Sequence, residues 1–107
     1  MDYTWDIIEY STRDQVNSDG VTLANAVVKV RWKKTGTTLG GVSANYIGLS
    51  HLTAENTAEG DFVSVDDITK ATLINWVKAS ISETEETIIN NVLQKKVDAQ
   101  AETVRTI

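Results

Sequence analysis

The stretch FVSVDDITKATLINWVKAS, residues 62–80, joins the end of an extended segment to the start of a capped helix. Thr69 is placed to act as the N-cap, because its hydroxyl can accept a hydrogen bond from a free backbone N–H of the first turn. Ile68 and Leu73 occupy the two positions of a hydrophobic staple, which packs the incoming chain against the new helix. This part of the sequence therefore predicts a helix over about 69–80.

A second helix is expected to follow almost at once. Ser82 and Glu85 have the spacing of a capping box, a pairing that satisfies two backbone N–H groups at a helix start. Apolar residues then recur at helical spacing and fall on one face: Ile88, Ile89, Val92, Leu93 and Val97. They cover too few heptads to specify a coiled coil, so we expect a helix over about 83–102 that packs on its own domain.

The residues before this region have the pattern of an antiparallel sheet. The clearest strand is VTLANAVVKVRWKKTG, residues 21–36, in which two sets of side chains alternate: Ala26, Val28, Val30 and Trp32 against Val27, Lys29, Arg31 and Lys33. Such alternation is typical of a sheet with one buried face. Further strands are expected in residues 3–10 and 42–52, where Gly48 indicates a bulge or a close backbone approach. The polar residues 11–20 end in an Asp-Gly turn signal and are predicted to form a loop.

Together these patterns predict one α+β domain over residues 1–107. An N-terminal antiparallel sheet of three or more strands, over about 3–65, precedes two helices that pack on one of its faces. The predicted core consists of the apolar residues that face inward in these elements: Trp5, Ile7, Val28, Val30, Trp32, Tyr46, Phe62, Leu73, Trp76, Val77 and Ile81.

Composition narrows the class of protein further. The chain has 107 residues, of which 41% are hydrophobic and 23% charged, and this balance favours a folded domain over disorder. It has no cysteine, which excludes disulfides and thiolate metal sites. Its net charge of −5 argues against partners such as nucleic acid or an anionic membrane. The acidic start MDYTWDIIEY lacks the features of a signal peptide, so the protein is expected to be made in the cytoplasm and not exported.

No group of residues predicts catalysis. His51 is the single histidine, and its neighbour Ser50 would point to the opposite face of a strand, so the two could not form a nucleophile–base pair. Asp61, Asp66 and Asp67 lack the spacing of a calcium loop, and the last two suit the start of the helix that follows. We therefore expect no enzyme activity, no cofactor and no metal site.

A row of basic residues is the candidate working surface. Lys29, Arg31 and Lys33 share one strand face, with Lys34 beside them in the sequence. Three interpretations are open: a solvated face whose charges discourage edge pairing, a docking site for an acidic protein surface, or a nucleic-acid site. The last is disfavoured, because no aromatic residue on that face could stack with bases. Lys29, Arg31 and Lys33 are thus the predicted partner-binding residues.

The opening stretch also resembles a family of small, poorly characterised proteins of tailed bacteriophages, notably marine and T7-like phages. In that family a phenylalanine and an apolar segment precede an acidic–Leu–Thr helix start and a Val-Ile-Gly-Trp-Val run. The matching positions here are Phe62, Asp67, Ile68, Thr69, Leu73, Ile74, Trp76 and Val77. Trp5-Asp6-Ile7, the strand with Val28, Val30 and Trp32, the segment Tyr46 to Leu49, and LQKKVDAQ are similar as well. Ser64 and Asn75 depart from the family's proline and glycine, and the chain lacks its Pro/Trp-rich ending.

The resemblance implies a virion structural or accessory protein, such as a head decoration or tail-associated protein, which acts by protein–protein contact. It would be made in the host cytoplasm and become part of the virion, with other virion proteins as partners. Self-association stays open. The alternative is a phage protein outside the virion that binds a host protein during infection. The motifs that carry the likeness mark caps and core positions, so the resemblance implies no catalytic residue.

Overall fold

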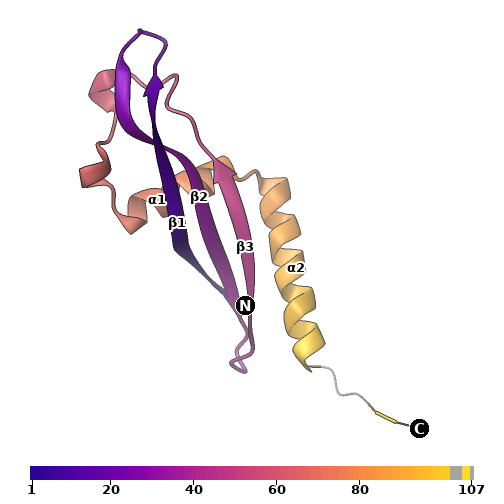
Figure 1. Cartoon of the computed structure of the whole chain (residues 1–107). Coiled ribbons are helices and arrows are strands. Elements are labelled where there is room, and N and C mark those ends of the chain that lie inside the picture. The colour runs from indigo at the N-terminus through magenta and orange to yellow at the C-terminus, as the bar shows by residue number, and fades with distance from the viewer. Residues whose placement is uncertain (102–104, 107) are drawn as a thin grey trace.

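The structure, a computed structural model, describes residues 1–101 and 105–106. It has the α+β order that the sequence predicts: three strands first and two helices last (Figure 1). The strands are β1 (Asp2–Val16), β2 (Thr22–Thr37) and β3 (Ser43–His51). Two short 3-10 turns, Glu59–Asp61 and Val65–Asp67, lead to α1 (Lys70–Ser80) and α2 (Glu83–Ala101). The predicted helix end at about 102 lies outside the described residues.

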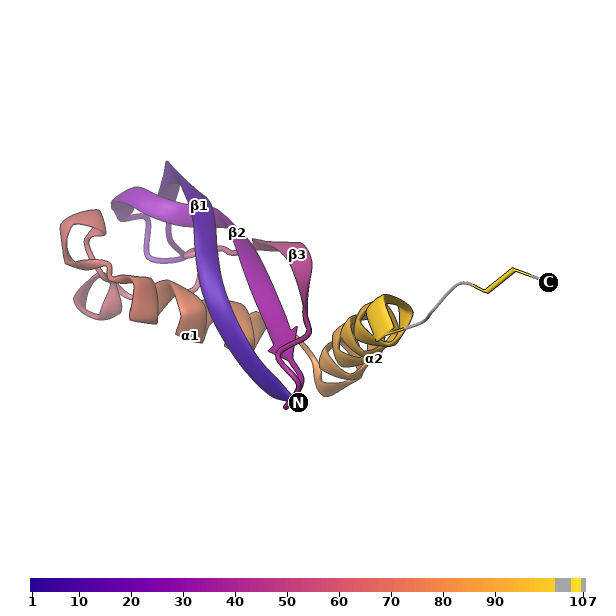
Figure 2. The ribbon, with the colours of Figure 1, turned by 90° about the horizontal axis from the view of Figure 1, so that it is seen from below.

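The three strands form one antiparallel sheet in the order β1-β2-β3. Both helices lie on the same side of it and share its buried cluster. Seen along the strands, α1 runs beneath β1 and β2, and α2 lies beyond β3 (Figure 2). The predicted fold class, a sheet followed by two helices on one face, is confirmed. Because β1 and β2 are joined by a tight turn, and β2 and β3 by another, the sheet needs no crossover connection.

The helix starts follow from the local signals in the sequence. The Thr69 side chain accepts a hydrogen bond of 3.2 Å from the backbone N–H of Thr72. Ser82 Oγ accepts one of 3.1 Å from the N–H of Glu85, which is one of the two hydrogen bonds of the capping box predicted for α2. The connection between the helices is therefore only two residues long and fixes where α2 begins.

The core lies between the sheet and the helices and centres on Trp32. Its indole ring packs 5.2 Å from that of Trp5 and 5.8 Å from the ring of Tyr46, and its Nε1 donates to Ser50 Oγ at 3.0 Å. Gly48 stands opposite Trp32 on β3, and the ring fills the space that a side chain there would need. Gly48 was predicted to mark a bulge or a close backbone approach; the β2–β3 register has no bulge there, and what lies against the glycine is the Trp32 side chain. The buried cluster is completed by apolar side chains from both layers: Val27, Val30, Ala44, Leu73, Val77, Ile89 and Leu93.

Most of the predicted core residues pack on this cluster. Four of them are buried within it: Val30, Trp32, Leu73 and Val77. Five more are half-buried and pack against it: Trp5, Ile7, Tyr46, Trp76 and Ile81. Phe62 is different, because it is half-buried outside the cluster, beside Trp76 in a hollow of ≈ 440 Å³. The prediction of Phe62 as a core residue is therefore wrong.

Val28 was also predicted to face the core, and this is wrong for a physical reason. Ser11 pairs with Lys29 and the next β1 residue, Thr12, pairs with Val27, so Val28 is a bulged residue with no partner on β1. A bulge adds one residue and reverses the alternation beyond it. Val27 is consequently buried in the cluster, whereas Val28 is half-buried outside it.

Two predicted element boundaries differ from the structure. Residues 11–16 continue β1 rather than forming a loop, because they pair with the first half of β2. The turn is confined to the residues around Asp19 and Gly20, where Gly20 has a φ of 79°. The sheet also ends at His51 instead of about residue 65, and the segment predicted to be extended contains the turn Val65–Asp67.

At both outer edges of the sheet, side chains form hydrogen bonds with backbone N–H or C=O groups. On β1, the N–H of Ile7 donates to Asp6 Oδ1 at 2.9 Å, and the same carboxylate lies 2.7 Å from Lys70 Nζ on α1. On β3, Lys96 Nζ donates to the carbonyl oxygen of Asn45 at 2.7 Å. Gln100 Nε2 likewise donates to Ser43 O at 2.8 Å. These edge contacts leave fewer backbone groups available to a further strand.

The Asp6 contacts predict a pH dependence of stability. The hydrogen bond from Lys70, and then that from Ile7 N–H, lower the pKa of Asp6 below its usual range. A lowered pKa in the folded state contributes stability that is present above the unfolded value of about 4 and is lost as the pH falls through the folded value. Asp6→Asn, which keeps the acceptor for Ile7, should therefore be less stable than wild type near neutral pH, and the gap should close in acid.

Urea denaturation between about pH 2 and pH 7 measures this gap. Asp61→Asn, a change of an exposed carboxylate on a 3-10 turn, is the matched control and should show no such closing. A gap that stays constant down to the lowest pH would contradict the assignment of the ion pair with Lys70.

Candidate interaction surface

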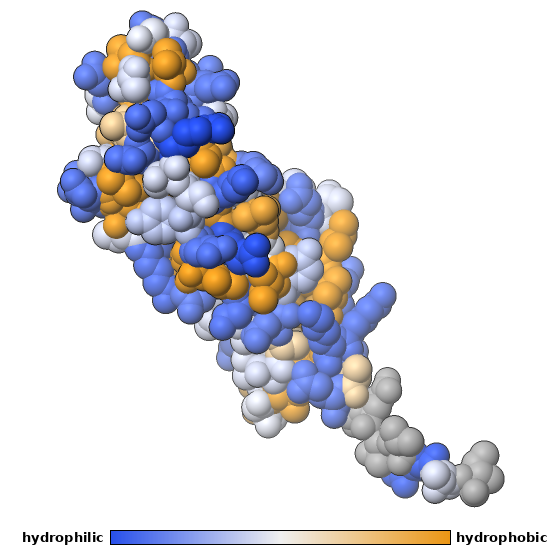
Figure 3. Space-filling view, viewed as in Figure 1, coloured by the Kyte–Doolittle hydropathy of each residue, from blue (hydrophilic) through white to orange (hydrophobic). Residues whose placement is uncertain are grey.

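The strand pairing sorts the side chains of the sheet onto two faces. On β2, Val30, Trp32 and Lys34 point to the helices, whereas the predicted partner-binding residues alternate with them and point away: Lys29, Arg31 and Lys33. Both helices lie on the first face, so the second is uncovered; we call it the open face. Figure 1 looks onto this face, and Figure 3 shows hydrophilic and hydrophobic side chains next to one another across it.

The open face carries three parallel rows of different chemistry. The middle row is the basic one on β2. The β1 row places Asp6 opposite Lys33 and Glu9 opposite Arg31. In the β3 row, Ile47 pairs with Lys33, Leu49 with Arg31 and His51 with Lys29. An acidic row, a basic row and a largely apolar row thus lie side by side.

The basic row is only lightly engaged by its acidic neighbours. Arg31 Nε lies 3.4 Å from Glu9 Oε1, and both side chains are at least half exposed. Such a pair contributes about 0–1 kcal/mol to stability, because water screens both charges. The guanidinium therefore keeps most of its capacity to bind an external carboxylate.

The apolar row is more exposed than apolar residues usually are. Ile47 is 59% exposed and Leu49 is 49% exposed. They lie next to each other on the open face, with Arg31 and Lys33 alongside. Exposed aliphatic side chains bordered by charges are typical of a protein-binding surface rather than of a small-molecule site.

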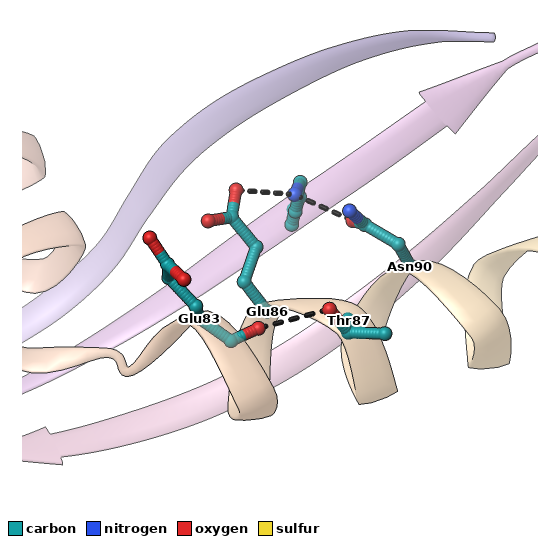
Figure 4. A network of polar contacts seen from close by, with 5 residues as sticks. Glu83, Glu86, Thr87 and Asn90 are labelled. Carbon is teal, nitrogen blue, oxygen red and sulfur yellow. Dashed lines mark hydrogen bonds and ion pairs between the residues drawn. The ribbon is translucent and has the colours of Figure 1, made fainter.

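Lys34 does not belong to this surface, although it follows Lys33 in the sequence. Its side chain is 1% exposed and its ammonium lies 4.4 Å from the ring centroid of Tyr3 and 4.8 Å from that of Trp5. From α2, Asn90 Oδ1 accepts a hydrogen bond from Lys34 Nζ at 2.6 Å, and Glu86 Oε1 lies 3.4 Å away. Figure 4 shows both α2 side chains reaching to the strand, with the backbone oxygen of Glu83 bound to Thr87 beside them.

The sequence pattern had not predicted this polar contact. The alternation of side chains along β2 could have indicated it. Lys34 continues the even-numbered series of Val30 and Trp32, which places it on the buried face. A lysine there needs an acceptor, and α2 supplies two polar residues one turn apart. Lys34 therefore anchors α2 to the sheet and is not available to a partner.

His51 and Ser50 lie as the strand pattern predicts, on opposite faces. His51 is exposed at the end of β3, whereas Ser50 is buried and bonded to Trp32 and, at 3.1 Å, to Ser80. Across residues 1–101, no three or more His, Asp or Glu side chains are grouped so that they could hold a metal ion. None of the helices formed by these residues is long and apolar enough to cross a membrane.

The fold and this surface define a class of small α+β protein, with a three-stranded antiparallel sheet that two helices cover on one face and leave bare on the other. Within that class, the chain belongs to the family described as Domain of unknown function (DUF7936), whose model matches residues 1–107. Comparisons with curated proteins and with solved structures give no match.

Proposed function

We propose that this protein is a structural or accessory component of a bacteriophage virion, and that it acts by protein–protein contact through the open face. The observation that carries the contact role is the uncovered row of Lys29, Arg31 and Lys33 with exposed Ile47 and Leu49 beside it. The placement in a phage particle rests on the sequence resemblance. The basic row suits an acidic surface on the partner, and the aliphatic residues supply area that association would bury.

Mass spectrometry of purified particles of the parent phage, with copy number, tests the placement. Hundreds of copies per particle would identify a head decoration protein, and a few to some tens would identify a tail or neck component. Absence from the particles would reject the virion role and favour the alternative, a protein that binds a host protein during infection.

The open face itself is tested by reversing its charge. Lys29→Glu with Arg31→Glu should leave the fold intact, because both side chains are exposed, and should reduce incorporation into particles at least tenfold. Arg13→Glu with Lys95→Glu makes the same change in net charge at exposed positions outside the row and is the control. Equal incorporation of both variants would reject the open face as the contact surface.

A further inference from the structure

The apolar row of the open face continues around the β3 edge onto α2. Ile88 on α2 is 55% exposed, and it lines a hollow of ≈ 350 Å³ together with Leu49 of β3. Figure 3 shows hydrophobic side chains on this side of the molecule both over the middle of the sheet and along α2. We call Ile47, Leu49 and Ile88 the apolar strip.

The apolar strip has opposite charges on its two flanks. On the sheet side lie Lys29 and Arg31 of β2. On the helix side lies Glu85 in the first turn of α2, which is exposed and lines the same hollow as Leu49 and Ile88. The other two acidic residues of that turn point elsewhere: Glu86 is directed to Lys34, and Glu83, two positions before Glu85, lies on another side of the helix. The strip is therefore positive on one side and negative on the other.

The two flanks also lie at the same level along the strands. Lys29 pairs with His51, and Arg31 pairs with Leu49. The same two β3 residues line the hollow that Glu85 lines from the helix side. The positive and negative groups are thus placed across from each other, with the apolar strip between them.

This arrangement is self-complementary under a two-fold rotation about an axis that lies in the contact surface and runs parallel to β3. Such a rotation keeps the level along the strands but exchanges the two flanks, so the positive flank of one copy meets the negative flank of the other. Both charge contacts are then attractive and the aliphatic side chains meet at the centre. We propose that the apolar strip binds a second copy of this chain and forms an isologous dimer; this rests on the proposed function in taking the open face as the contact surface.

Two other ways of self-association are less suited to the molecule. Stacking two open faces centred on β2 would bring the basic rows of both copies against each other. Adding the β3 edge of one copy to that of another would compete with Lys96 and Gln100, which already bind its carbonyl groups at Asn45 and Ser43. Neither obstacle applies to the strip.

A charge exchange tests the dimer. One variant carries Lys29→Glu and Arg31→Glu, and the other carries Glu85→Lys. Each should be a monomer, because both of its flanks then have the same sign. An equimolar mixture should form a one-to-one heterodimer, since both contacts between the two variants are again attractive. Sedimentation equilibrium from about 1 µM to about 300 µM, on chains shown by circular dichroism to be folded, measures this.

Ile88→Ser is the uncharged companion variant. It should weaken the wild-type dimer at least tenfold without being rescued by either charge variant, because it removes the centre of the contact. A monomeric wild type over the whole concentration range, or a mixture that stays monomeric, would overturn the dimer. If the wild type is monomeric while Lys29→Glu with Arg31→Glu still abolishes incorporation into particles, the proposed function stands with a different acidic partner. If the dimer forms but the particles lack the protein, the dimer stands and the virion role falls.

Discussion

Gly48→Ala is expected to destabilise the protein by about 3 kcal/mol, because among the glycines this is where an added Cβ meets the closest atoms. A Cβ at this position would lie far inside van der Waals contact with three atoms of the Trp32 indole. The ring cannot move away easily, because Trp5 and Tyr46 pack against it and Ser50 accepts its N–H. The added methyl therefore has to displace the centre of the core.

Urea denaturation of three variants separates this explanation from a general effect of losing a glycine. Gly40→Ala is the matched control, because its Cβ would meet only Thr38 Oγ1 at an ordinary 3.8 Å, and we expect a change below about 0.5 kcal/mol. In a Trp32→Leu background the ring is absent, so Gly48→Ala should cost at least about 1 kcal/mol less than in wild type. Costs that simply add would show that the ring is not what excludes the methyl.

The second large effect concerns the buried ammonium of Lys34. Removing its two acceptors should destabilise the protein much more than removing the ammonium itself. Glu86→Leu with Asn90→Leu leaves the charge in the core without an acceptor and should cost about 3–5 kcal/mol. Lys34→Met removes the charge but keeps most of the volume, while Glu86, which is half exposed, regains water. The loss in that variant should stay within about 1 kcal/mol, because the desolvation of the ammonium is also avoided.

The triple variant, with all three changes, should recover most of the stability that the two leucines remove. Glu83→Leu with Asn91→Leu is the control, since these α2 residues are exposed and have the same types. If Lys34→Met proves as harmful as the loss of both acceptors, the ammonium makes a net contribution of its own and the asymmetry is wrong.

The features that were predicted correctly from the sequence depend on residues that lie close together in the chain. Thr69 and Ser82 begin the two helices because capping needs only the first turn of the chain that follows. The alternation around Trp32 placed three basic residues on one face for a similar reason. The order of elements and the face that the helices cover follow from these observations.

The features that were not predicted from the sequence depend on contacts between distant parts of the chain. Residues 11–16 are polar and resemble a loop, yet they form a strand because the first half of β2 pairs with them. The bulge at Val28 depends on how β1 and β2 pair, and the periodicity within one strand cannot show that pairing. Phe62 lies outside the core because the chain crosses to α1 through 3-10 turns rather than a strand. The anchoring of Lys34 required a helix more than fifty residues away in the sequence.

The side chains at the edges of the sheet have a consequence for the behaviour of the protein at high concentration. Asp6 on one edge, and Lys96 with Gln100 on the other, occupy groups through which exposed strands recruit further strands into cross-β fibrils. Long exposed strand edges are a hazard whenever a chain accumulates to high concentration. These contacts therefore oppose the growth of ordered aggregates at both edges of the sheet.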